Sequence, residues 1–117
     1  MVLKIGHRGA MGYEPENTLS SFEKAIELGV DMIELDVRLC KDLEVVVFHD
    51  DKLSRFANAE GYVIEKSLEE LKKLDVKGGG KIPALREALN HINKRAKVNI
   101  ELKGRGSVEF VEKIITE

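Results

Sequence analysis

The sequence predicts an α/β domain built on a largely parallel sheet. Apolar, β-branched runs alternate along the chain with segments whose apolar residues recur at helical spacing. The 117 residues include 43% apolar and 34% charged side chains, and they contain no linker or low-complexity tract. A chain of this length and composition forms one domain with a core, so disorder and a division into two ordinary domains are both excluded.

Four segments rich in apolar and β-branched residues are predicted strands: residues 2–7, 30–37, 43–49 and 97–102. The link between the second and third strands is short, because no helix fits between Asp36 and Leu43. It is either a hairpin turn at Lys41-Asp42 or an extended return segment. Residues 50–66 show no periodicity and are predicted to form a long loop.

Four segments with apolar residues at helical spacing are predicted helices: residues 17–29, residues 67–75, a segment opened by Pro83, and a segment that begins at Ser107. The first should be capped by Ser20 with Glu23 and end at Gly29. The second carries a capping pair formed by Ser67 and Glu70. Alternation of these helices with the strands is the reason for predicting a parallel sheet.

The charge and the cysteine content limit which partners and which cellular compartment we expect. The 19 Lys and Arg residues against 21 Asp and Glu residues give a net charge of −2, which argues against a nucleic-acid backbone as the main partner. Cys40 is the single cysteine and cannot form an internal disulfide. The first residues lack the apolar core of a signal peptide, and no stretch approaches the ~20 apolar residues of a transmembrane helix. We therefore expect a soluble, cytoplasmic protein without a transmembrane segment.

Polar and charged side chains that could bind a ligand or catalyse a reaction lie where the predicted strands end. The set comprises His7, Arg8, Glu34, Asp36, His49, Glu101 and Lys103. Sites of parallel α/β folds form at the carboxyl ends of their strands. Side chains two residues apart on a strand share a face, so Glu34 lies with Asp36, and Glu101 with Lys103.

Three converging carboxylates need a counter-charge, and an all-oxygen set favours Mg²⁺, Mn²⁺ or Ca²⁺. Histidine is the side chain best suited to exchange a proton near neutral pH, so His7 and His49 suit acid and base work. Arg8 and Lys103 match a phosphate. Together these groups describe a phosphoryl-transfer site. The competing interpretation is ordinary surface charge, which is the commoner fate of a single Glu-x-Asp; four polar strand ends favour the site.

Five ordered motifs cover nearly the whole chain: residues 7–18 (HRGAMGYEPENT), 29–37 (GVDMIELDV), 45–50 (VVVFHD), 81–87 (KIPALRE) and 99–103 (NIELK). Together they resemble the glycerophosphodiester phosphodiesterases of the phospholipase-C-like phosphodiesterase superfamily. The resemblance implies a TIM-type (β/α) barrel. Residues 1–117 would be the N-terminal portion of such a domain and supply roughly its first four strands, a half barrel.

The resemblance also implies an activity, the hydrolysis of glycerophosphodiesters to sn-glycerol 3-phosphate and an alcohol with one divalent metal. It suggests His7 and His49 as catalytic residues, Glu34, Asp36 and Glu101 as metal ligands, Arg8 and Lys103 as phosphate or substrate contacts, and Glu16 and Asn17 as supporting residues. The expected partner is a small-molecule glycerophosphodiester. A cyclic phosphate intermediate and direct attack by water both remain open.

Three departures from the family pattern stand out. Leu43 replaces the usual glycine, so the turn should be made differently; residues 55–61 follow the family loop only loosely; Ala84 stands where threonine often caps the helix.

An open half barrel exposes two unpaired sheet edges, so we expect either self-association into a homo-oligomer or a truncated chain. Two alternative functions remain. One is an inactive half barrel that binds a phosphorylated ligand or partner, and the other is a relative that cleaves lysophospholipids.

Overall fold

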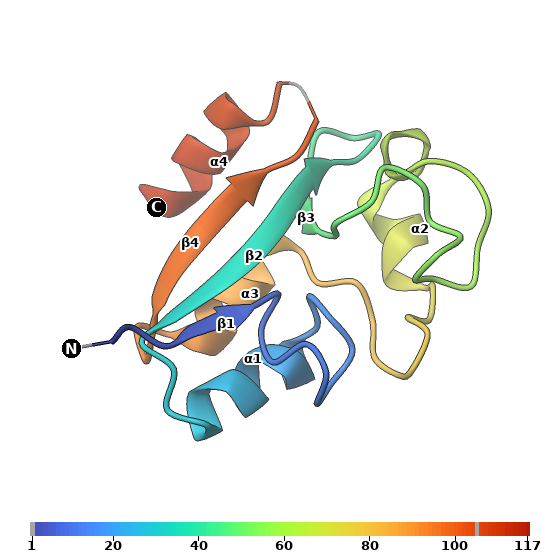
Figure 1. Ribbon diagram of the computed structural model, residues 1–117. Helices are drawn as coiled ribbons and strands as arrows, with labels where there is room; N and C mark the ends of the chain where they lie inside the picture. The colour runs from blue at the N-terminus through green and yellow to red at the C-terminus, as the bar shows by residue number, and fades with distance from the viewer. Residues whose placement is uncertain (1, 105) are drawn as a thin grey trace.

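The computed structural model describes residues 2–104 and 106–117. Its elements are β1 (Ile5–His7), α1 (Leu19–Glu27), β2 (Met32–Leu39), β3 (Val45–Val47), the 3-10 helix η1 (Val63–Glu65), α2 (Leu68–Lys72), α3 (Leu85–Ile92), β4 (Lys97–Leu102) and α4 (Val108–Ile115) (Figure 1). All predicted strands and helices are present. The strand predicted over residues 97–102 has those bounds, whereas β1 and β3 are shorter than predicted.

The sheet is organised around the long central strand β2. β1 and β4 pair with β2 in parallel, as predicted, and place His7 opposite Glu34 and Asp36 opposite Glu101. β3 runs antiparallel to β2, so the link after Asp36 is a hairpin. Within the described chain, β1 and β4 pair only with β2, which leaves the sheet open. An open sheet of this kind is the fold of a half barrel.

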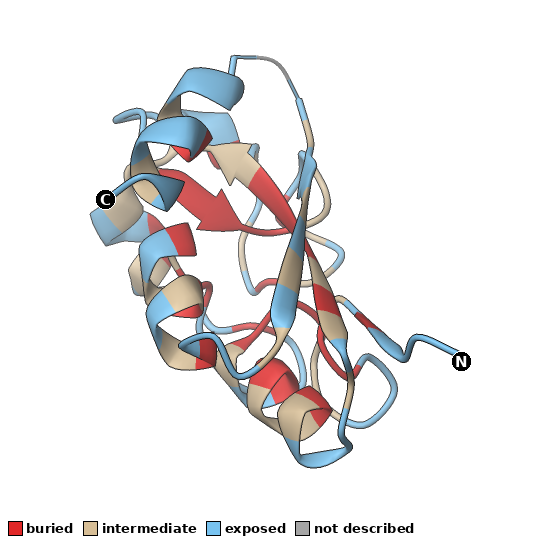
Figure 2. Ribbon diagram, turned by 90° about the vertical axis from the view of Figure 1, so that its left-hand side faces the viewer, coloured by how far each residue is buried: buried red, intermediate tan, exposed pale blue. Residues whose placement is uncertain are grey.

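Helices α1, α3 and α4 cover one face of the sheet (Figures 1 and 2). Ile33, Leu35 and Val37 alternate along β2 and are fully buried against Phe22 of α1 and Leu85 of α3. Each such side chain stabilises the fold by about 1.5–3 kcal/mol through burial. Because side chains alternate along a strand, the residues between them point to the opposite, helix-free face. That face therefore carries the acidic residues of β2.

Residues 50–82, here called the arm, pack with buried side chains of residues 40–48 into a second and smaller core. Leu53, Val63, Leu71 and Ile82 are each no more than 1% exposed and pack together. The prediction of a long loop over residues 50–66 was therefore incomplete, because this segment contains η1 and a buried apolar cluster. The apolar residues of 50–66, such as Leu53 and Val63, follow neither a helical nor a strand period, so periodicity could not reveal that they are buried.

The turn between β2 and β3 closes with a hydrogen bond from the Leu43 amide to the Cys40 carbonyl at 3.0 Å. Leu43 itself adopts a φ of +64°, the left-handed region that a glycine normally fills. That this turn differs from the one in the family stays a prediction. Leucine takes the glycine conformation, at a cost of about 1–2 kcal/mol.

Helix caps differ in part from the predictions. α1 is capped by Thr18, whose hydroxyl accepts from the Ser21 amide, and the predicted Ser20 cap was wrong. Thr18 is preferred because Ser20 already lies inside the helix. The Ser67–Glu70 capping box of α2 is confirmed. At α3, Ala84 caps without a side-chain bond, and the Glu87 carboxylate accepts from its amide at 3.0 Å.

Candidate functional site

Three carboxylates converge on the helix-free face of the sheet. Asp36 and Glu101 are direct neighbours in the β2–β4 register, and Glu34 lies two residues before Asp36 on the same face. One ligand oxygen from each of the three lies within 4.8 Å of the others. Asp36 is buried, Glu34 is partly buried and Glu101 is exposed. The exposure of the three carboxylates therefore increases from Asp36, through Glu34, to Glu101.

Protein cations already neutralise part of this cluster. Arg8 Nε lies 3.3 Å from Asp36 Oδ2, and Lys103 Nζ donates to Glu101 Oε1 at 2.8 Å. The lysine is the main reason that the pKa of Glu101 is lowered. Burial, followed by the nearby Asp36 charge, instead raises the pKa of Glu34. Glu34 is thus the member of the cluster whose charge is least compensated.

The buried oxygens of the cluster fit a hard cation. The amide of Asn17 donates to Asp36 Oδ2 at 3.0 Å, while Asp36 Oδ1 is buried without a hydrogen-bond partner among the described residues. A buried carboxylate oxygen with no partner is costly, and a divalent cation would satisfy it. An all-oxygen set suits Mg²⁺, Ca²⁺ or Mn²⁺.

His7 borders the cluster from the end of β1. Its Nε2 lies 3.6 Å from Glu34 Oε2, and 53% of its side chain is exposed. The parallel pairing of β1 with β2 places it there, as expected for the carboxyl end of a parallel strand.

His49 reaches the cluster by a different route. β3 pairs with the far end of β2 and runs back, and the Phe48 amide donates to the Asp36 carbonyl at 3.0 Å. Of the two links left open after Asp36, the hairpin is the one that forms, and it brings the backbone before His49 back beside Asp36. Arg38 Nε donates to the His49 carbonyl at 2.9 Å and holds this part of the backbone.

Arg55 is a site residue that the sequence did not reveal, whereas Asp50 belongs to the motif of residues 45–50. His49 Nδ1 lies 2.6 Å from Asp50 Oδ1, and Arg55 Nε donates to Asp50 Oδ2 at 2.7 Å. The Arg55 guanidinium is the main reason that the pKa of Asp50 is lowered to about 2. The available signal was weak: a single arginine between the apolar Leu53 and Ala57.

The loop after β1 carries Glu16 and Asn17 into the site. Glu16 is 6% exposed and contacts two arginines, Arg8 NH1 at 3.2 Å and Arg55 NH2 at 2.9 Å. Arg8 and Asn17 adopt left-handed φ values of +52° and +55°. Gly9 packs so closely on α1 that an added Cβ would lie 2.2 Å from the Ser21 hydroxyl oxygen. Left-handed non-glycine residues are strained and gather at functional sites.

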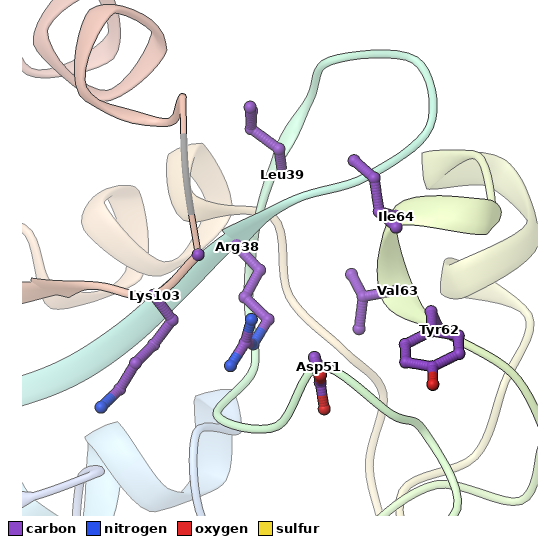
Figure 3. Close-up of a pocket in the computed structure, with 8 residues that line it drawn as sticks. Arg38, Leu39, Asp51, Tyr62, Val63, Ile64 and Lys103 are labelled. Atoms are coloured by element: carbon purple, nitrogen blue, oxygen red, sulfur yellow. The ribbon is translucent and has the colours of Figure 1, made fainter.

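A pocket of about 300 Å³ opens beside the cluster (Figure 3). It is lined by Arg38, Leu39, Asp51, Tyr62, Val63, Ile64, Lys103 and Gly104. Two of its lining residues also contact the site. Lys103 Nζ pairs with Glu101, and Arg38 Nε donates to the His49 carbonyl. The opposite wall, from the arm, is largely apolar.

Cys40 lies apart from this chemistry. Its side chain is fully buried, and burial raises the pKa of its thiol to about 11. A buried, protonated thiol is not a nucleophile.

Among the described residues, no helix is long and apolar enough to cross a membrane.

An open, mostly parallel α/β sheet, with acidic residues, histidines and basic residues gathered at the ends of its strands, defines a half barrel with a polar site. The sequence matches the glycerophosphoryl diester phosphodiesterase family over residues 7–114. The chain belongs to this family, and the resemblance seen in its five motifs is confirmed.

Relatives with known names agree with this membership. The chain is 47% identical over 109 residues to a glycerophosphodiester phosphodiesterase of Caldanaerobacter subterraneus, covering 86% of this chain and 45% of the relative. It is 33% identical over 117 residues to a human lysophospholipase D, covering 89% of this chain and 37% of the relative. The chain thus spans less than half the length of these curated relatives.

A solved structure shows the same backbone. A phosphodiesterase of Oleispira antarctica, determined in complex with its product sn-glycerol-3-phosphate, superposes with a TM-score of 0.93 at 35% identity. The alignment covers 100% of this chain and 53% of that one. The half barrel is therefore the fold of the first half of a family member.

Proposed function

We propose that the chain is the N-terminal portion of a glycerophosphodiester phosphodiesterase domain, and that this domain hydrolyses glycerophosphodiesters to sn-glycerol 3-phosphate and an alcohol. The observation that carries the proposal is the carboxylate cluster bordered by two histidines. The solved relative that binds sn-glycerol-3-phosphate supports the choice of product.

In this proposal Glu34, Asp36 and Glu101 hold one divalent cation, Mg²⁺, Ca²⁺ or Mn²⁺. The buried Asp36 Oδ1 without a hydrogen-bond partner supports this assignment. When bound, such a cation neutralises negative charge on phosphate oxygens. Glu16 and Asn17 support the cluster, Glu16 by holding Arg8 and Asn17 by donating to Asp36.

The two histidines exchange protons with the reacting oxygens. Because the pKa of Asp50 is low, its carboxylate is ionised, and His49 Nδ1 must donate to it. The Nε2 atom of His49 is then free to take or give a proton. His7, with an exposed ring beside Glu34, supplies the complementary group.

Hydrolysis breaks the bond between phosphorus and the oxygen of the alcohol, and that oxygen leaves with a proton from one histidine. A new bond forms between phosphorus and an oxygen of water, whose proton passes to the other histidine. If a neighbouring substrate hydroxyl attacks first, a cyclic phosphate results; water then bonds to phosphorus and gives a proton to one histidine, while the ring bond to that hydroxyl oxygen breaks and the oxygen takes a proton from the other histidine. Arg8 and Lys103 bind phosphate oxygens as fixed positive charges. The pocket of Figure 3, which begins at Lys103, gives room for the departing alcohol.

The test is the release of glycerol 3-phosphate from glycerophosphocholine in the presence of Mg²⁺, Ca²⁺ or Mn²⁺. Product that depends on the cation and is lost in His49→Ala supports the proposal. Cation-dependent binding of glycerol 3-phosphate without turnover would instead identify an inactive binding half barrel. Cleavage of lysophosphatidylcholine in preference to glycerophosphocholine would identify the activity that is named for the human relative.

A further inference from the structure

Arg55 joins the two loops that carry the candidate catalytic groups. It belongs to the arm, and its guanidinium reaches Glu16, which is 39 residues away in the sequence. The side chain is 49% exposed, so it contributes little to either core. Its hydrogen bonds all go to carboxylates: Nε and Nη2 reach the two oxygens of Asp50 at 2.7 and 3.2 Å, and Nη2 reaches Glu16 Oε2 at 2.9 Å. The guanidinium also lies 5.3 Å from the centre of the Phe56 ring.

Each carboxylate that Arg55 binds has one further partner in the site. Asp50 contacts the ring of His49, and Glu16 contacts Arg8. Arg8 in turn lies beside Asp36 of the carboxylate cluster. An unbroken chain of charged contacts thus runs from the candidate catalytic histidine to a candidate metal ligand, with Arg55 at its centre.

We infer that Arg55 is a positioning residue for the proposed reaction: it orients the Asp50 carboxylate so that His49 keeps its proton on Nδ1 and presents Nε2 to the substrate. The inference rests on the proposed function, since it concerns the role of His49. A carboxylate that accepts from one ring nitrogen fixes the tautomer and the orientation of the ring. The two-pronged contact matters, because a guanidinium fork holds both oxygens of a carboxylate and an ammonium group does not.

A role in the stability of the arm alone is the competing explanation. The two explanations differ in one observable property, the tautomer of His49. If Arg55 only tied the loops together, its loss would lower the free energy of unfolding and leave the proton on Nδ1. If it positions Asp50, its loss frees that carboxylate to rotate, and His49 takes up the other tautomer in part.

The experiment is a long-range ¹H–¹⁵N correlation spectrum of the histidine side chains in the 117-residue chain, which has only three histidines. We expect the unmodified chain to show His49 with its proton on Nδ1. Arg55→Gln should shift the two ring nitrogens of His49 toward the Nε2-protonated pattern, and Arg55→Lys should restore the original pattern only in part. The rate of glycerophosphocholine turnover should fall about 10- to 100-fold in Arg55→Gln. KM should change less than about threefold.

The matched control is Arg86→Gln. Arg86 also binds one carboxylate through Nε and NH2, that of Glu117 at 2.8 and 2.6 Å, but lies on α3 away from the cluster. It should leave the His49 signals and the turnover unchanged.

An unaltered His49 tautomer in both Arg55 variants would overturn the inference, and so would the unfolding of both. A chain that releases no product from any glycerophosphodiester would refute the proposed function instead, and the tautomer would still be readable.

Discussion

The two histidines of the candidate site are held in place by different numbers of contacts. His49 is held by its carbonyl, through Arg38, and by its ring, through Asp50, which Arg55 holds in turn. His7 ends a three-residue strand and has 53% of its side chain exposed, and its ring nitrogen lies 3.6 Å from Glu34 Oε2. The His49 side is therefore positioned before any ligand arrives, whereas the His7 side depends on the charge state of the cluster.

The largest expected effect tests whether both sides take part in the reaction. His49→Ala and His7→Ala should each lower kcat for glycerophosphocholine by about 10²- to 10⁴-fold, the usual contribution of a general acid or base. The measurement is the initial rate of glycerol 3-phosphate release. The control is His91→Ala, which removes a histidine that contacts Glu23 on the outer helices. Unchanged turnover in His49→Ala would exclude the role proposed for that residue.

The second prediction tests the support beneath the His49 side. Leu53 is fully buried in the arm core. Leu53→Ala should lower the free energy of unfolding by about 2–5 kcal/mol, because it leaves a cavity among packed side chains. Denaturant unfolding measures the change. Leu28→Ala, at a position that is 44% exposed, should cost less than about 0.5 kcal/mol. Equal effects at the two positions would show that the arm has no core of its own.

The third prediction concerns how the free energy of unfolding falls at acidic pH. The pKa of Asp50 is lowered from 3.8 to about 2. Asp50 therefore stabilises the folded state fully above about pH 4, and this contribution, about 2 kcal/mol, is lost as the pH falls through 2. Asp50→Asn should remove that pH-dependent part. Unfolding measured between pH 5 and 2 should show a shallower decline for Asp50→Asn than for the unmodified chain.

An exposed ion pair provides the control for this loss of stability at acidic pH. Asp75 pairs with Lys81 at the surface, with 67% of the Asp75 side chain exposed. Asp75→Asn should follow the curve of the unmodified chain, because exposed pairs contribute little. Parallel curves for all three proteins would show that Arg55 does not hold Asp50 in solution.

The smallest expected effect concerns the hairpin that delivers His49. Leu43 is 54% exposed and has a φ of +64°. Leu43→Gly should relieve the strain and raise the free energy of unfolding by up to about 1 kcal/mol, since glycine adopts this conformation without a steric cost. Leu43→Ala keeps the strain and should bring no gain. A destabilised Leu43→Gly would mean that the leucine side chain contributes packing that outweighs the strain.

Local sequence patterns predicted most of the sheet, because alternation along β2 and β4 is a local property that carries the carboxylates with it. The spacing of Glu34 and Asp36 thus predicted a shared face, and only the register with β4 was needed to add Glu101. The antiparallel direction of β3, which brings His49 back toward Asp36, was only one of two alternatives at the sequence level, since a single strand does not encode its direction.

Long-range contacts account for what was missed. Arg55 reaches Glu16 across 39 residues, and no local pattern encodes that meeting. The buried cluster of residues 50–66 escaped prediction because Leu53 and Val63 follow an irregular backbone path and show no periodicity.

The central claim is that Glu34, Asp36 and Glu101 form a divalent cation site, and thermal unfolding with and without the cation tests it most directly. The unmodified chain should melt higher with millimolar Mg²⁺, Ca²⁺ or Mn²⁺ than with EDTA, by the equivalent of about 2.7 kcal/mol at a hundredfold excess over Kd. Asp36→Asn should weaken this shift, whereas Asp75→Asn should keep it. An unmodified chain that melts at one temperature in EDTA and in all three cations would contradict the account, because the three carboxylates would then be ordinary surface charge.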